Sequence, residues 1–217
     1  MNLSELRDLF RYTTGDTAKP PLWKDKEIDG YANDAVDEAC RRANLIVDST
    51  SDLAQVSLSA GDSYFDIDES IIYIRRAILA SVGRTLCPKV SRSMDEEVPN
   101  WESATASVPM VFVPDWNTGK VALWPPSSSA DTIRMTVIRT PKDEMVNDED
   151  EPEIAKRFHR ALLDWMLHLG YLKQDADTFD PKKAAQHEER FAGEFGPPSS
   201  AIDETFGAEQ YYDIGYR

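Results

Sequence analysis

Two stretches near the beginning of the chain carry apolar residues at helical spacing. Residues 3–11 place three leucines and a phenylalanine on one side, and Gly15 followed by two adjacent prolines ends the pattern. Residues 25–47 then repeat small apolar side chains at the helical period. Trp23 and the acidic residues after it fit the beginning of this second helix, because an apolar side chain can close over the first turn and negative charge is stabilised there. The sequence therefore predicts a short helix followed by a longer one.

The helical period returns after an acidic stretch that ends near residue 150. Asp150 suits a helix cap and Pro152 a first helical turn, and an apolar stripe then runs over residues 154–172. A further helix is expected after Asp180, which is followed directly by a proline, and it should end at Gly196. The sequence thus predicts two more helices toward the end of the chain.

Between these helical regions the pattern changes to short runs rich in β-branched and aromatic residues. The runs follow one another from Leu53 to Ile138 and are separated by Gly, Pro, Asn and Ser. Residues 115–119 lie between two apolar runs, and their composition predicts a hairpin turn with Gly119 in a left-handed conformation. This middle block should form a small antiparallel sheet or barrel.

The order of these elements predicts an α+β fold with a divided helical domain. Helices on the two sides of the β-rich block should pack together, since neither pair can bury its apolar stripe alone. We expect a helical bundle built from the N- and C-terminal helices at 1–50 and 150–196, a β-rich insertion domain at 51–149, and a C-terminal arm at 197–217.

Composition and charge narrow the classes of function. The 217 residues are 41% hydrophobic and 29% charged, which is typical of a soluble globular protein with a real core. No apolar run is long enough for a membrane span, and no secretory signal is visible, so synthesis in the cytosol is expected. Cys40 and Cys87 lack the spacing of a metal or redox motif and are interpreted as reduced thiols. The net charge of −15 repels phosphates and argues against tight DNA binding.

The candidates for enzyme or metal chemistry are weak. Asp66 and Asp68 would share one face of a strand and could form a carboxylate pair for glycoside hydrolysis, although a solvated strand face is favoured. The acidic run 143–153 lacks the glycine and ligand spacing of a calcium loop. The histidines and three of the tryptophans lack the neighbours that metal binding or base stacking requires, and structural roles are favoured for His159, His168, His187, Trp101, Trp116 and Trp124. The sequence therefore predicts no catalytic, cofactor-binding or metal-binding residue.

The last residues of the chain are rich in aromatic side chains. Such side chains give a large contact area at a small entropic cost, so an arm of this composition could dock on a partner, or equally on its own domain. The candidate partner-binding residues are Phe206, Tyr211, Tyr212, Ile214, Tyr216 and Arg217.

Four segments of the chain share their order and character with a known family. The helical ones read WKDKEIDGYANDAVDEACRRANLI and ALLDWMLHLGYLKQDADTFDPKKAAQHEERFAGEFG. Between them lie PNWESATASVPMVFV and KVALWPPSSSADTIRMTVIRTP, which match the β insertion of that family. Over about residues 20–196 the chain resembles the head-to-tail connector (adaptor) proteins of tailed bacteriophages.

This resemblance implies a structural role in the virus particle and no enzyme activity. Members form homo-oligomeric rings, commonly of twelve subunits, that bind the portal protein on one side and tail or nozzle proteins on the other. DNA passes through the ring without sequence-specific binding. The expected location is the neck of the virion, after synthesis in the bacterial host cytoplasm, with no membrane partner. The alternatives are a virion-associated peptidoglycan hydrolase and a neck or tail completion protein that does not contact the portal.

Overall fold

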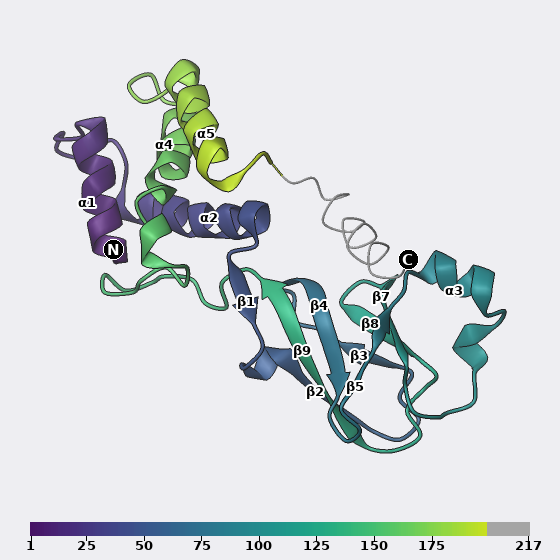
Figure 1. The fold of residues 1–217 in the computed structure, drawn as a ribbon. Coiled ribbons are helices and arrows are strands. Elements are labelled where there is room, and N and C mark those ends of the chain that lie inside the picture. Colours follow the sequence, from purple (N-terminus) through teal and green to yellow (C-terminus); the bar gives the residue numbers. More distant parts are fainter. Residues whose placement is uncertain (199–217) are drawn as a thin grey trace. The chain divides into compact units, whose positions relative to one another are not determined.

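The computed structural model describes residues 1–198, which form two compact units (Figure 1). The helical unit contains residues 1–46 and 140–198, and the β unit contains residues 47–139. The chain therefore leaves the helical unit once, builds the β unit, and returns. The α+β class predicted from the sequence is confirmed, with helices toward both ends of the chain and strands between them.

The helical unit buries the apolar stripes of its helices in one core. Residues from all of its long helices contribute, including Phe10, Ile28, Leu162 and Phe191, each with no exposed surface. Burial of these stripes is the main source of stability for helices of this length. Within the described residues its elements are α1 (Leu3–Thr14), α2 (Asp25–Ala43), the 3-10 turn η3 (Lys156–Phe158), α4 (Leu162–Leu172) and α5 (Pro181–Phe195).

Local hydrogen bonds fix several of the predicted helix ends. At the start of α1, the Asn2 side chain accepts from the Glu5 N–H at 2.9 Å, and the Glu5 carboxylate accepts from the Asn2 N–H at 3.1 Å. Gly15 follows α1 with φ at 70°, a left-handed conformation that suits glycine. At the start of α5, Asp180 accepts from the Lys183 N–H at 3.0 Å. These ends agree with the sequence prediction.

The predicted beginning of α4 is wrong by about eleven residues. The Asp150 carboxylate accepts from the backbone N–H groups of Val146 at 2.9 Å and Asn147 at 2.7 Å, both of which precede it. It therefore closes a turn on its N-terminal side and does not cap a helix on the other. The chain continues in turns and the short η3 helix, and α4 begins only at Leu162.

The end of α2 also differs from the prediction. The helix stops at Ala43, because Asn44 adopts a left-handed conformation with φ at 51°. The apolar residues beyond it enter strand β1 (Ile46–Asp48), which pairs with β9 (Asp131–Arg139). The prediction ran past the end of the helix because Ile46, the first residue of β1, is buried and fits the helical spacing of apolar residues.

A buried ion pair orders the loop between α1 and α2. Arg11 contacts Asp16 at 2.8 Å, and the Asp16 side chain has no exposed surface. Asp16 also accepts from the backbone N–H groups of Leu22 at 3.0 Å and Trp23 at 3.3 Å, and Arg11 donates to the Trp23 carbonyl at 2.9 Å. A buried carboxylate needs such partners, so this network determines where Trp23 enters the core.

The strands of the β unit form two small sheets. Sheet A contains β1, β2 (Gln55–Leu58), β4 (Ile71–Leu79), β5 (Arg84–Thr85) and β9, in the order β1-β9-β4-β5, with β2 also paired to β9. Sheet B has the order β3-β8-β7-β6, and its strands are β3 (Tyr64–Asp66), β6 (Cys87–Pro88), β7 (Val111–Asn117) and β8 (Lys120–Trp124). Strands β6 and β7 pair in parallel, whereas the pairs β2–β9, β3–β8, β4–β5, β4–β9 and β7–β8 are antiparallel.

Strand β8 of sheet B is buried on both faces. Along β8, Val121 and Leu123 belong to the core that sheet A also lines, whereas Ala122 belongs to a second core on the other face. Successive strand residues point to opposite faces, so this alternation places one face of β8 against each core. The second core is formed with α3 (Ser91–Glu97) and the 3-10 turn η2 (Trp101–Ser103).

The hairpin predicted at residues 115–119 is confirmed, but its turn is shorter than predicted, because β7 runs to Asn117 and β8 begins at Lys120. Strands β7 and β8 pair antiparallel, and Asn117 lies opposite Lys120 at their turn. Gly119 has φ at 70°, which is the left-handed conformation expected from the sequence.

Candidate interaction surfaces

The two carboxylates proposed for hydrolysis do not lie in one strand. Strand β3 ends at Asp66, which forms an ion pair with Lys120 on β8 at 2.9 Å. Asp68 lies in the following turn, where it accepts from the Ser70 N–H at 3.0 Å and the Ser70 hydroxyl at 2.6 Å. The prediction that they share a strand face is therefore wrong, because the strand is too short to include both.

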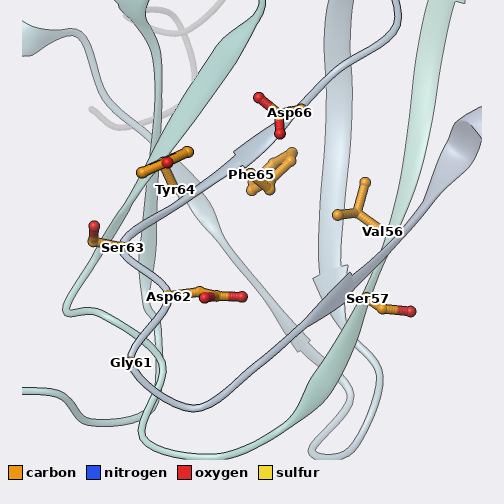
Figure 2. A pocket seen from close by; sticks show the side chains of 8 residues that line it. All are labelled: Val56, Ser57, Gly61, Asp62, Ser63, Tyr64, Phe65 and Asp66. Carbon is orange, nitrogen blue, oxygen red and sulfur yellow. The ribbon is translucent and has the colours of Figure 1, made fainter.

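An open hollow of about 410 Å³ lies beside β3 (Figure 2). Its polar side chains already serve the local fold: Asp62 accepts from the Ser59 N–H at 2.6 Å, and the Tyr64 ring stacks on Trp116 at 5.4 Å. Figure 2 shows Asp66 at one end of the hollow and Asp62 at the other. The residues lining it are Val56, Ser57, Gly61, Asp62, Ser63, Tyr64, Phe65 and Asp66. Among these lining residues, no serine hydroxyl is hydrogen-bonded to a carboxylate that could activate it.

The histidines hold backbone and side-chain groups within the helical unit. His159 is buried, and its Nε2 lies 3.0 Å from the Ile154 carbonyl oxygen. The Nδ1 atom of His168 lies 3.0 Å from the Ala184 carbonyl oxygen. The Nδ1 atom of His187 lies 2.7 Å from a carboxylate oxygen of Asp164. Residues 1–198 contain no group of three or more His, Cys, Asp or Glu side chains placed to hold a metal ion.

The tryptophans of the β unit pack on the outer side of sheet B. Trp101 belongs to the second core and donates from its indole N–H to Asp95 at 2.9 Å. Trp116 and Trp124 pack against the same core, and Trp116 donates to Glu102 at 2.8 Å. The predicted role in core packing and turn anchoring is confirmed.

An acidic patch lies on the helical unit. We define it as Asp34 and Asp37 of α2 together with Glu144, all of them exposed. Asn33 brings the two segments together, since its side chain accepts from the Met145 N–H at 2.9 Å and donates to the Met145 carbonyl at 3.1 Å. Residues more than a hundred positions apart in the sequence therefore share one surface.

The carboxylates of this patch repel one another. Partial burial of its carboxylate raises the pKa of Asp34, because burial disfavours the charged form, and the negative charge of Glu144 raises this pKa further. Partial burial likewise raises the pKa of Asp37, as do the charges of Asp34 and Glu144, while Arg41 acts in the opposite direction. The patch therefore carries negative charge that its surroundings do not fully neutralise.

An arginine face lies on the outer side of sheet A. We define it as Arg75 and Arg76 of β4 together with Arg134 of β9, all of them exposed. Ile74 pairs with Val137 and Arg76 with Thr136, so that Arg75 is an extra residue in a β-bulge. The bulge allows two consecutive arginines to face away from the core, and this break in alternation is the sequence signal that could have revealed the face.

No helix in the described part of the chain is both long and apolar enough to cross a membrane.

Comparison with known proteins identifies the family. The family model of the SU10 adaptor protein matches residues 1–207, which include both units. The chain belongs to this family of phage adaptor proteins. Comparison with curated proteins gives no match. The family resemblance predicted from the sequence is thus confirmed, and with it a structural, connector-type role in assembly of the bacteriophage virion.

The predicted partner-binding residues of the adaptor lie outside the described residues. This applies to the whole set of Phe206, Tyr211, Tyr212, Ile214, Tyr216 and Arg217. The acidic patch and the arginine face are the candidate interaction surfaces within residues 1–198, and neither was predicted from the sequence.

Proposed function

We propose that the adaptor forms a ring, of about twelve copies by the family resemblance, between the portal and the tail of a bacteriophage, and that the genome passes through its centre. The observation that carries this proposal is the adaptor family match over residues 1–207, which covers the divided helical unit as well as the β unit. The ring would bind the portal on one side and tail or nozzle proteins on the other. The subunits would be made in the host cytoplasm and reside in the virion neck.

The charge of the chain supports passage of DNA without adhesion. Each copy has a net charge of −15, so a ring of about twelve copies would surround its channel with on the order of 180 negative charges. Such a surface repels phosphates and has few cations to displace the counterions condensed on DNA. The genome could therefore slide through such a channel.

Electron microscopy of the virus particle tests this proposal. We expect a symmetric layer that lies directly against the portal and whose density fits the helical and β units of the adaptor. The purified chain should also co-sediment with purified portal assemblies, whereas a capsid protein of similar charge should not. A particle in which this polypeptide is missing, or lies away from the neck, would contradict the proposal.

The C-terminal arm is proposed to strengthen attachment to the portal or to a neighbouring subunit. Removing residues 197–217 should weaken attachment at least tenfold in the same sedimentation assay, because aromatic anchors supply much of the energy of such contacts. The truncation keeps Gly196, whose carbonyl accepts from Arg42 at 3.3 Å, so α5 should stay intact. Attachment at full strength by the truncated chain would show that the arm packs on its own domain or is dispensable.

A further inference from the structure

The arginine face has no carboxylate at the strand positions paired with Arg76 and Arg134. Residues directly opposite in a β-ladder share a face, so Arg76 shares its face with Thr136, and Arg134 shares its face with Ile78 and Gln55. The outward positions of β2, β4, β5 and β9 around the arginines are all uncharged, namely Gln55, Ser57, Ile78, Thr85, Thr132 and Thr136. Within residues 1–198, none of the three arginines forms an ion pair.

Some other cations on the surface of the chain form local ion pairs. Lys120 pairs with Asp66 at 2.9 Å, and Lys156 pairs with Glu151 at 3.0 Å, both on the surface. A chain with 39 acidic side chains against 24 basic ones offers many such partners. A purely solvated face of this protein would therefore be expected to mix carboxylates with its cations, as these pairs do. The arginine face instead gathers like charges on adjacent strands, which are shown side by side in Figure 1.

The acidic patch is the complementary surface on the same chain. Asp34 and Asp37 are one helical turn apart on α2, and the hydrogen bonds of Asn33 hold the segment with Glu144 next to them. Guanidinium groups bind carboxylates with two parallel hydrogen bonds, and arginine is enriched in protein interfaces. Every copy of the chain carries both surfaces.

We propose that the arginine face of one copy binds the acidic patch of the next copy. The contact is heterologous, because it joins two different surfaces, and repetition of a heterologous contact closes into a ring when the rotation permits. This inference rests on the proposed function and identifies the surfaces that would join its subunits. A second copy is favoured over DNA as the occupant, since the net charge of −15 repels phosphates and each copy can satisfy the charges of its neighbour.

Charge reversal tests the contact with the full-length chain in low salt, without the portal. Sedimentation should show self-association of the unaltered chain that weakens as salt is added. The face variant, Arg76→Glu with Arg134→Glu, and the patch variant, Asp34→Lys with Asp37→Lys, should each associate at least tenfold more weakly, because attraction becomes repulsion. An equimolar mixture of the two should recover association to within about threefold, since each variant then meets a neighbour of opposite charge.

The control replaces two arginines of the helical unit that are also exposed and form no ion pair within residues 1–198. Arg160→Glu with Arg190→Glu changes the net charge as much as the face variant does, and should leave self-association nearly unchanged. Circular dichroism and thermal unfolding of each variant establish that it is folded. Normal association of either folded variant, or a mixture that fails to recover, would overturn the proposal.

The same variants separate this contact from the other possible outcomes. If the face variant associates normally but loses adsorption to duplex DNA, the arginine face is a nucleic-acid surface and the inference is wrong. A chain that self-associates through these surfaces but is missing from the neck would retain the inference and overturn the adaptor role. An unaltered chain that attaches to the portal but never self-associates would retain the adaptor role and overturn the inferred contact.

Discussion

Replacement of Asp48 by alanine is expected to lower the free energy of unfolding of the β unit by about 3–5 kcal/mol. One oxygen of the Asp48 carboxylate accepts from Arg139 at 2.8 Å and from the Ser51 hydroxyl at 2.7 Å, and the other accepts from the N–H groups of Thr50 and Ser51, both at 3.1 Å. The side chains of Asp48 and Arg139 are only 7% and 6% exposed. Removing this carboxylate takes away a hydrogen-bonded counter-charge of a buried guanidinium, and urea unfolding followed by circular dichroism would measure the loss.

The contribution of Asp48 should also depend on pH. Burial alone would raise the pKa of Asp48, but hydrogen bonds from Ser51, Arg139 and Thr50 outweigh burial and hold the pKa well below its ordinary value of 3.8. Because the folded state then binds the proton less readily than the unfolded state, the stabilisation is fully present above the ordinary pKa and is lost as the pH falls below it.

The Asp48→Asn variant is the matched control for this pH dependence. It keeps the size of the side chain but cannot titrate, so it should be less stable than the unaltered chain at pH 7. The difference in unfolding free energy should narrow as the pH falls below about 4. A difference that is constant between pH 7 and pH 2 would show that the carboxylate charge does not stabilise the β unit.

Features that depend on neighbouring residues were predictable from the sequence. Gly15 ends α1, Asp180 with its following proline begins α5, and Gly119 forms the hairpin turn. Each depends on a backbone conformation or a hydrogen bond within a few residues. The period of apolar residues similarly identifies the helical and β-rich regions, because burial of one face determines that period.

The start of α4 and the end of α2 were predicted wrongly because the local sequence fits two structures equally well at each place. Asp150 can cap a following helix or close a preceding turn, and the choice depends on how segment 143–150 packs against α2. The residues after Asn44 fit the helical period, but they pair with β9, about ninety positions later in the chain. Neither partner can be identified from local sequence.

The candidate surfaces were missed because both depend on long-range contacts. The acidic patch requires Asn33 to bind the backbone of Met145, and the two are 112 positions apart. The arginine face requires the register of β4 against β9, in which the bulge at Arg75 turns a second arginine outward. The sequence shows two consecutive arginines in a strand-like run, but not that Arg134 shares their surface or that Glu144 lies beside α2.

Replacement of Gly170 by alanine is expected to destabilise the helical unit by about 1–3 kcal/mol. A Cβ atom at this position of α4 would lie 2.7 and 2.9 Å from two ring atoms of Phe10. That ring has no exposed surface and packs edge-on against Trp23 at 5.4 Å, and the Trp23 indole donates to the Gly170 carbonyl at 3.1 Å. The ring therefore has little room to move away, and thermal or urea unfolding should reveal the strain.

Two other helical glycines are matched controls with the opposite expected sign. Gly30 of α2 and Gly193 of α5 are exposed, and an added Cβ atom would meet nothing within 4 Å at either. Alanine should stabilise the chain by about 0.5–1 kcal/mol at these positions, because it loses less backbone entropy on folding. If contact with Phe10 is the cause at Gly170, Phe10→Leu should reduce the cost of Gly170→Ala in a double-mutant cycle. Equal stabilisation at all three glycines would show that the core around Phe10 adapts to the added methyl group.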